Sequence, residues 1–189
     1  MATATAPQSG SPRVEDPDRF DLRFPDRVAG VPIWIVIGAV VLAVMAISGI
    51  LRSRYLGNQF WMDEGLSVGI SSHALVNIPH VLRHDGSPPL YYLMLHVWMS
   101  VFGSSESATH ALSLIFGLLC IPVGTWVAWD LFGRWPAVIA LVLFALNPFL
   151  TAYSQETRMY SLMALLGLLA TFAFIKGFIY RQRGYLILF

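Results

Sequence analysis

The stretch that decides the fold is VPIWIVIGAVVLAVMAISGIL, residues 31–51, which contains no charged residue. An α-helix rises about 1.5 Å per residue, so this run is about 30 Å long as a helix. That length matches the hydrocarbon core of a bilayer. We therefore predict that residues 31–51 form a transmembrane helix.

The composition of the whole chain agrees with a membrane setting. Hydrophobic residues make up 56% of the 189 residues and charged residues only 12%, whereas soluble domains carry roughly 25% charged residues. The net charge is +1, and the basic residues form no cluster that could follow a phosphate backbone, which argues against a nucleic-acid partner. The single cysteine, Cys120, has no partner in the chain for a disulfide and no metal-binding spacing.

Further apolar runs predict an all-α polytopic membrane protein with about four transmembrane helices. After 31–51, spans are expected at 108–129, 136–150 and 159–179, with an outer loop at 52–107. Within that loop, residues 90–102 are apolar but too few to cross a bilayer, which predicts an interfacial or re-entrant juxtamembrane helix. A short, tilted crossing is the alternative.

The two ends of the chain differ from this pattern. Residues 1–30 are polar and rich in Pro, Asp and Arg, so we expect a disordered cytoplasmic tail preceding a transmembrane domain over 31–189. Residues 186–189 resemble the start of another span, and we therefore expect the protein to continue beyond Phe189.

Basic residues indicate the orientation, because cytoplasmic loops are enriched in Lys and Arg. With the N-terminus inside, eight basic residues are cytoplasmic and four are outside. The cytoplasmic set is Arg13, Arg19, Arg23, Arg27, Arg134, Lys176, Arg181 and Arg183, and the outer set is Arg52, Arg54, Arg83 and Arg158. We expect a plasma-membrane protein with its N-terminus in the cytoplasm and the long loop outside.

An acidic pair, Asp63 and Glu64, follows Phe60-Trp61-Met62 soon after the first span. A carboxylate beside aromatic residues at a membrane surface could serve as a general base toward an acceptor hydroxyl. Adjacent helical residues point about 100° apart, so one of the two is expected to support the other. The alternative interpretation is a helix cap or a solvated loop.

Two further polar clusters lie on the same predicted face. Arg83 and His84 precede Pro88, Pro89 and Tyr91 at the start of the juxtamembrane helix. An arginine and a helix N-terminus can both receive a phosphate, although a loop that merely enters a helix would show the same pattern.

The second cluster, Glu156 and Arg158, joins two spans and could share a site with the first loop; an interfacial belt is the alternative. The histidines form no zinc motif, so no metal or cofactor is predicted, and a divalent metal stays open.

Taken in order, three motifs resemble the membrane glycosyltransferases of the GT-C superfamily. They are Trp61-Met62-Asp63-Glu64, Ser87-Pro88-Pro89-Leu90-Tyr91-Tyr92 and Tyr153-Ser154-Gln155-Glu156-Thr157-Arg158-Met159-Tyr160. The resemblance is to bacterial mannosyltransferase-like and aminoarabinose-transferase-like enzymes, and more distantly to protein O-mannosyltransferases. It covers roughly residues 59–179.

This resemblance implies transfer of a sugar from a polyprenyl phosphate to a lipid, glycan or protein acceptor at the outer face, with inversion at the anomeric carbon. It implies that Asp63 is the essential acidic residue and that Glu64 is the adjacent one. The donor-binding residues that it implies are Pro88, Pro89, Tyr91, Glu156 and Arg158. Arg83 and His84, from the polar cluster that precedes Pro88, are the further candidates for donor binding. Ser87 stands where some relatives have Lys or His. We expect the chain to be the N-terminal part of such an enzyme, which could be inactive alone.

The alternative is a non-catalytic multi-span scaffold or assembly protein, which would have no reason to place Asp63, Glu156 and Arg158 on one face. A transporter is a third class, but no predicted span carries an acidic residue at mid-depth, where a coupling site would often need one.

Overall fold

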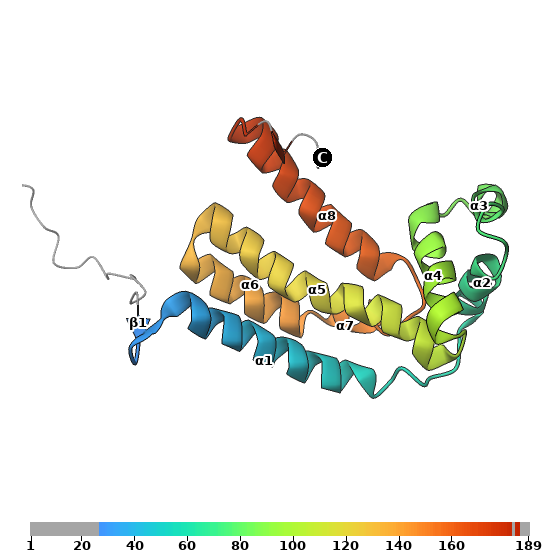
Figure 1. Ribbon diagram of the computed structural model, residues 1–189, viewed down its shortest axis with the longest axis horizontal. Helices are drawn as coiled ribbons and strands as arrows, with labels where there is room; N and C mark the ends of the chain where they lie inside the picture. The colour runs from blue at the N-terminus through green and yellow to red at the C-terminus, as the bar shows by residue number, and fades with distance from the viewer. Residues whose placement is uncertain (1–26, 183, 186–189) are drawn as a thin grey trace, which may run out of the picture.

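The computed structural model describes residues 27–182, 184 and 185 (Figure 1). Helices make up 76% of it, which confirms the predicted all-α fold class. Strands β1 (Arg27–Val28) and β2 (Val31–Pro32) pair antiparallel just before the first helix. Residues 27–30, expected to belong to the tail, therefore form part of a hairpin, and residues 1–26 lie outside the described residues.

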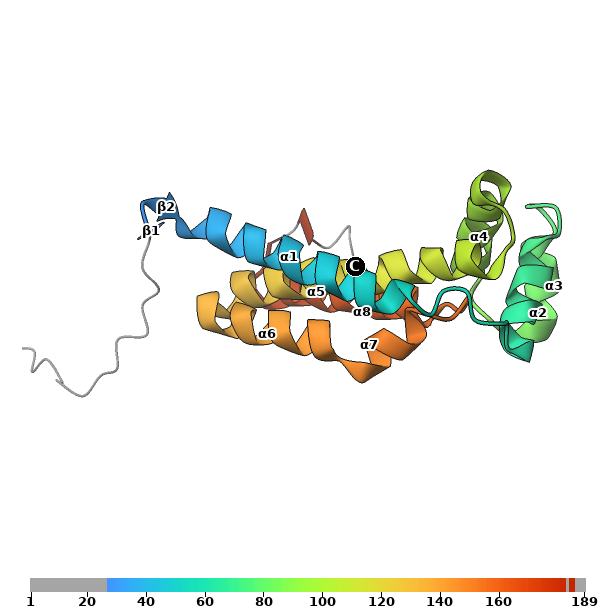
Figure 2. The same ribbon diagram turned by 90° about the horizontal axis from the view of Figure 1, so that it is seen from below.

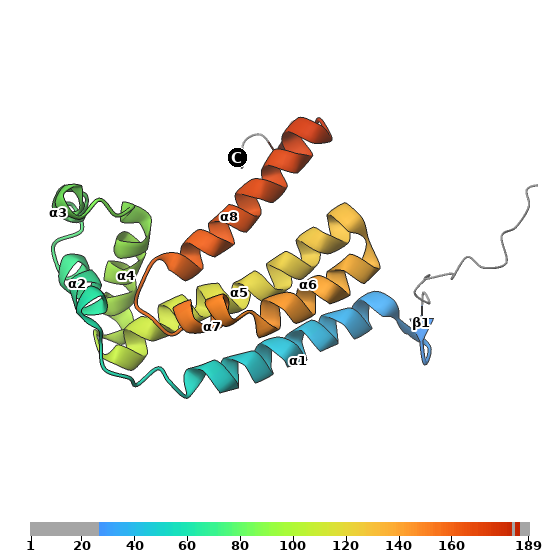
Figure 3. The ribbon, with the colours of Figure 1, turned by 180° about the vertical axis from the view of Figure 1, so that it is seen from behind.

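Among the described residues, three helices are long and apolar enough to cross a membrane: α1 (Ile33–Ser53), α5 (Glu106–Phe132) and α8 (Tyr160–Phe174) with its continuation η1 (Ile175–Ile179). Helix α6 (Arg134–Leu146) is shorter and returns beside α5 after a turn at Gly133, whose φ of 95° favours glycine. Helices α1, α5 and α6 lie side by side, and α8 diverges from them (Figures 1 and 3).

Helix α5 is the centre of this arrangement because it contacts α1, α4, α6, α7 and α8. It begins at Ser105, whose hydroxyl accepts a hydrogen bond from the Ala108 amide, and Glu106 lies in the first turn. Both features stabilise a helix N-terminus. The outer face of α1, in contrast, is apolar and exposed, as at Leu42 and Ile50, which suits contact with lipid.

The helix that we expected over 136–150 is divided in two. Helix α6 ends at Leu146, and the Asn147 side chain then accepts a hydrogen bond from the Leu150 amide at 3.0 Å, starting α7 (Pro148–Tyr153). Pro148 cannot donate a backbone hydrogen bond, so it suits the first turn of the new helix. Buried Arg52 donates to the Ala145 carbonyl at 3.3 Å, which places a cation at the negative end of α6.

Helices α2 (Met62–Ser71), α3 (Ile78–Asp85) and α4 (Pro89–Phe102) gather at one end of the long helices (Figures 1 and 2). Helix α4 runs across this end rather than alongside α5 (Figure 1). The interfacial position of residues 90–102 stays a prediction. The loop between α7 and α8 lies at the same end, whereas the α5–α6 turn lies at the opposite end (Figure 1).

The packing of α5 against α6 generates a stability prediction. Gly124 faces Phe144 so closely that a Cβ atom would overlap the ring, while Gly167 in α8 has no such neighbour within 4 Å. Alanine in place of glycine normally favours a helix by about 1 kcal/mol, but overpacking costs about 1–3 kcal/mol. Gly124→Ala should lower the thermal midpoint of the purified protein in detergent, and Gly167→Ala should leave it unchanged or raise it. Equal shifts would contradict this packing.

Candidate functional site

Two segments far apart in sequence meet at the end of the molecule where α2 lies. One is the first turn of α2, which carries Asp63 and Glu64, and the other is the loop 154–159 between α7 and α8, which carries Glu156 and Arg158. The structure thus brings the acidic pair and the loop 154–159 together.

Glu64 is buried, with 2% of its surface exposed, and both carboxylate oxygens are engaged. Oε2 accepts the Trp61 amide proton at 2.9 Å, which closes the first turn of α2. Oε1 accepts the amide proton of Thr157 at 2.7 Å and lies 2.7 Å from His110 Nε2. Glu64 is thus the member of the pair that supports the structure.

His110 on α5 completes this network. Its Nδ1 lies 2.7 Å from the carbonyl oxygen of Leu56, which can only accept, so Nδ1 carries a proton. In neutral imidazole Nε2 would then be an acceptor facing a second acceptor, the carboxylate of Glu64. One further proton must therefore lie between Nε2 and Oε1. Sequence reasoning gave His110 no role, since a histidine in an apolar run is usually a packed residue.

Asp63 has the opposite character to Glu64. Its side chain is 73% exposed, and its carboxylate lies 4.0 Å from Arg158 Nη2, which is a loose pair. The backbone carbonyl of Asp63 accepts a hydrogen bond from Arg158 Nη1 at 3.2 Å. The carboxylate of Asp63 therefore stays available to a bound molecule.

These groups line a polar cavity of about 300 Å³. Its walls are Trp61, Asp63, Glu64, Tyr153, Glu156, Arg158 and Tyr160. A second cavity of about 180 Å³ shares Trp61, Glu64 and Glu156 with it. The guanidinium of Arg158 lies over the Tyr160 ring at 5.6 Å, a cation–π geometry that holds the cation at the wall. Carboxylates, one cation and aromatic faces thus surround one space.

Glu156 carries a charge in a partly buried place. Burial raises the pKa of its carboxyl group, and the nearby charge of Glu64 raises the pKa further, while Arg158 and His110 oppose the shift. Carboxyl groups with a raised pKa are found in functional sites and also in structural ion-pair networks.

The residues predicted around the start of α4 are not brought into this cavity. Arg83, Pro88 and Pro89 are exposed and do not line it, and the side chain of His84 lies outside the described part of the chain. Tyr91 is buried behind the site; its hydroxyl lies 2.8 Å from Ser113 Oγ, which donates to the Arg158 carbonyl at 3.2 Å. Tyr91 thus supports the loop that carries Arg158.

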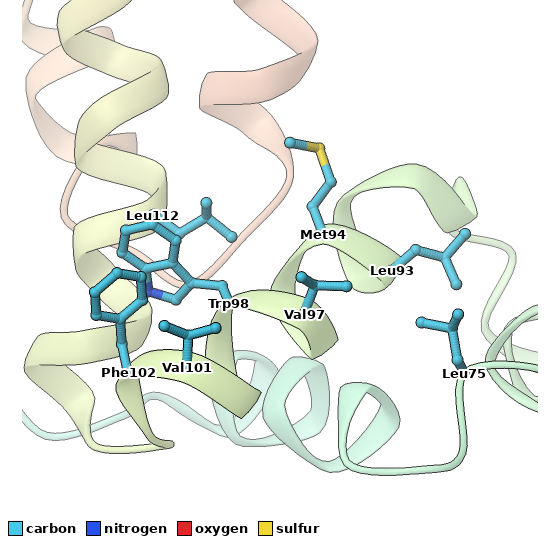
Figure 4. A pocket seen from close by; sticks show the side chains of 8 residues that line it. All are labelled: Leu75, Leu93, Met94, Val97, Trp98, Val101, Phe102 and Leu112. Carbon is cyan, nitrogen blue, oxygen red and sulfur yellow. The ribbon is translucent and has the colours of Figure 1, made fainter.

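A separate apolar groove of about 510 Å³ runs along α4 (Figure 4). It is lined by Leu75, Leu93, Met94, Val97, Trp98, Val101, Phe102 and Leu112. The one polar group on these side chains, the indole N–H of Trp98, donates to the Ala108 carbonyl at 2.7 Å. The groove therefore offers contact area to an apolar chain and no group for chemistry on a sugar.

Within the described residues, no cluster of three or more His, Cys, Asp or Glu side chains is placed to hold a metal ion.

A family model described as dolichyl-phosphate-mannose-protein mannosyltransferase matches residues 86–189, more than half of the chain. The chain belongs to this family. It is thus a membrane glycosyltransferase of the GT-C type, as the three motifs predicted. Comparison with curated proteins and with solved structures found no match.

The mannosyltransferase match contains the Pro-Pro motif of α4 and the loop 154–159, and it begins after Asp63 and Glu64. The case for the acidic pair therefore rests on its geometry. Trp61 and Thr157 join the site through backbone amides, which sequence patterns do not reveal. The position of Glu64 three residues after Trp61 is the one available signal, because it fits the glutamate of a capping box.

The raised pKa of Glu156 predicts how stability depends on pH. In the window between its ordinary and its raised pKa the folded state binds more protons than the unfolded state, so stability falls as pH rises through this window. Glu156→Gln removes the charge, so the thermal midpoint should rise at neutral pH and should not change at acidic pH, where the carboxyl group is already protonated. A shift of the same size at both pH values would contradict the role of charge.

Proposed function

We propose that this protein transfers a sugar from a polyprenyl-phosphate donor to an acceptor hydroxyl at the outer face of the membrane, with Asp63 as general base. The observation that carries the proposal is the placement of Asp63 and Arg158, 95 positions apart in sequence, on one polar cavity. The Asp63 carboxylate offers a proton acceptor, and the Arg158 guanidinium offers a cation for the donor phosphate. The family membership supports the reaction class.

The proposed reaction is a single displacement. The acceptor oxygen attacks the anomeric carbon as its proton moves to the Asp63 carboxylate, and the bond between the anomeric carbon and the phosphate oxygen breaks. Polyprenyl phosphate leaves with the electron pair. Arg158 offers the leaving phosphate a paired hydrogen-bonding fork, and attack from the opposite side inverts the anomeric carbon.

The walls of the cavity suit a sugar beside these two groups. The aromatic faces of Trp61, Tyr153 and Tyr160 supply apolar contact, and the carboxyl group of Glu156 can accept a hydrogen bond from a sugar hydroxyl. We propose no metal in this step. The acceptor is a lipid, a glycan or a protein, since the chemistry of a hydroxyl nucleophile is common to all three.

The assignment of Asp63 predicts a kinetic signature. Asp63→Asn keeps the size of the side chain but cannot accept a proton, so turnover in the full-length protein should fall by about 10²–10⁴-fold. Donor binding should persist, because Arg158 is unchanged. The measurement is transfer from a radiolabelled polyprenyl-phosphate sugar together with donor binding in lipid nanodiscs.

Arg158→Ala is the matched comparison, because it should weaken donor binding. Arg158→Lys should restore that binding only in part, since an ammonium group cannot form the fork. Normal turnover of Asp63→Asn would contradict the general-base assignment. Absence of sugar transfer by the unsubstituted full-length protein would favour the alternative that it is a non-catalytic membrane scaffold.

We also propose that the N-terminus is cytoplasmic and that the cavity faces outward, which single-cysteine labelling can test. Leu66 in α2 and Phe132 at the end of α5 are 50% and 69% exposed. Helix α2 and the α5–α6 turn lie at opposite ends of the molecule (Figure 1). In a Cys120→Ala background, an impermeant maleimide should label Leu66→Cys in intact cells. It should label Phe132→Cys only after permeabilisation. The reverse pattern would place the cavity in the cytoplasm.

A further inference from the structure

We infer that the buried pair of Glu64 and His110 is the positioning device of the cavity, which holds Asp63 and Arg158 beside each other in its wall. This inference rests on the proposed function for the roles of Asp63 and Arg158, but the contacts that carry it are independent of any reaction. Glu64 and His110 are positioning residues here, because their polar atoms are already engaged by the protein itself.

The contacts of Glu64 lie next to both functional side chains along the chain. Glu64 follows Asp63 directly, and Thr157 precedes Arg158 directly. The hydrogen bond from the Thr157 amide to Glu64 Oε1, at 2.7 Å, therefore joins the two segments one residue away from each functional side chain. The contact between Arg158 Nη1 and the Asp63 carbonyl, at 3.2 Å, follows from this join.

His110 anchors this join to the core. It belongs to α5, the central helix, and is itself 1% exposed. Through Nε2 it fixes Glu64, and through Nδ1 it fixes the Leu56 carbonyl in the segment between α1 and α2. The Phe60 ring packs edge-on against the imidazole, with ring centroids 5.5 Å apart. One imidazole thus ties α2, and with it the loop 154–159, to the core.

The hydrogen bonds at position 64 require an acid rather than an amide. The side chain introduced by Glu64→Gln would have one acceptor oxygen and one donor nitrogen. If that nitrogen took the place of Oε2, it would face the Trp61 amide, and if it took the place of Oε1, it would face the Thr157 amide. Either orientation sets a donor against a donor, so Glu64→Gln must release one backbone segment.

The charges of Glu64 and His110 are also matched to each other. The pair shares one proton, so it is either an imidazolium with a carboxylate or two neutral groups, and its net charge is zero in both cases. Removing either partner leaves an uncompensated group in a buried place, which is far more costly than losing an exposed pair. The two residues should therefore act as one unit, and their single and double substitutions should not be additive.

The test measures position before it measures activity. Spin labels at Met62→Cys in α2 and Ala152→Cys in α7, both exposed, report the distance across the cavity in the full-length Cys120→Ala protein in nanodiscs. We expect a narrow distance distribution for the unsubstituted protein and for Asp63→Asn. We expect a broad one for Glu64→Gln, for His110→Gln and, to the same extent, for the double variant. Glu106→Gln, a carboxylate change at the start of α5, is the control and should stay narrow.

The second measurement is enzyme activity, which should depend on how Asp63 and Arg158 are positioned. Because Asp63 and Arg158 are both displaced, Glu64→Gln and His110→Gln should lower kcat and raise the donor KM together, with kcat falling by roughly 10²-fold. Asp63→Asn should lower kcat alone. If Glu64→Gln does not accumulate in the membrane, Glu64→Asp, which keeps both acceptor oxygens on a shorter arm, and His110→Gln carry the same expectation.

The outcomes separate this inference from the proposed function. A narrow distribution in Glu64→Gln and His110→Gln would overturn the positioning role, and lost turnover with a narrow distribution would assign Glu64 to the chemistry. A broad distribution combined with full turnover of Asp63→Asn would uphold the positioning role and overturn the general base. Additive broadening in the double variant would also overturn the inference, because two independent contacts would then be involved.

Discussion

Three groups converge on the buried carboxyl group of Glu64: the amides of Trp61 and Thr157, which donate hydrogen bonds to it, and the imidazole of His110, which shares a proton with it. Burying a carboxylate normally lowers the stability of the folded protein. Here both oxygens of Glu64 are hydrogen-bonded and His110 balances its charge. The position of α2 and the path of the loop 154–159 both depend on it. The carboxylate of Asp63 and the guanidinium of Arg158 each lie one residue from these contacts, and the Asp63 carbonyl and the Tyr160 ring further hold the guanidinium.

The membrane explains why so few contacts can hold the site. Lipid-facing helices gain little from burying apolar surface against one another, so hydrogen bonds and close packing specify the arrangement. Helix α5 meets this demand with small residues, such as Gly124 beneath Phe144, and with polar residues near its start, such as His110 and Ser113. The core of the fold and the support of the cavity are therefore parts of the same helix.

Much of this could be predicted from the sequence, because apolar runs and their charge flanks follow directly from the cost of placing charges in lipid. The long helices, the crosswise helix at 90–102 and the meeting of Asp63 with Glu156 and Arg158 belong to that part. The break at Asn147 depends on one side-chain cap, and the role of His110 depends on a carbonyl, that of Leu56, which no pattern marks. The phosphate-binding pattern that suggests Arg83 and the family motif that suggests Pro88 and Pro89 carry no information on distance, and the folded chain places these residues outside the cavity.

The most direct measurement is amide hydrogen exchange at Thr157 in the full-length protein in lipid. Thr157 lies in a loop between helices, so its amide would ordinarily exchange fast, but here it is buried and donates to Glu64. We predict slow exchange at Thr157, comparable to that of helical amides in α5, and fast exchange after Glu64→Gln. Fast exchange at Thr157 in the unsubstituted protein would contradict the claim that Glu64 holds the two halves of the site together.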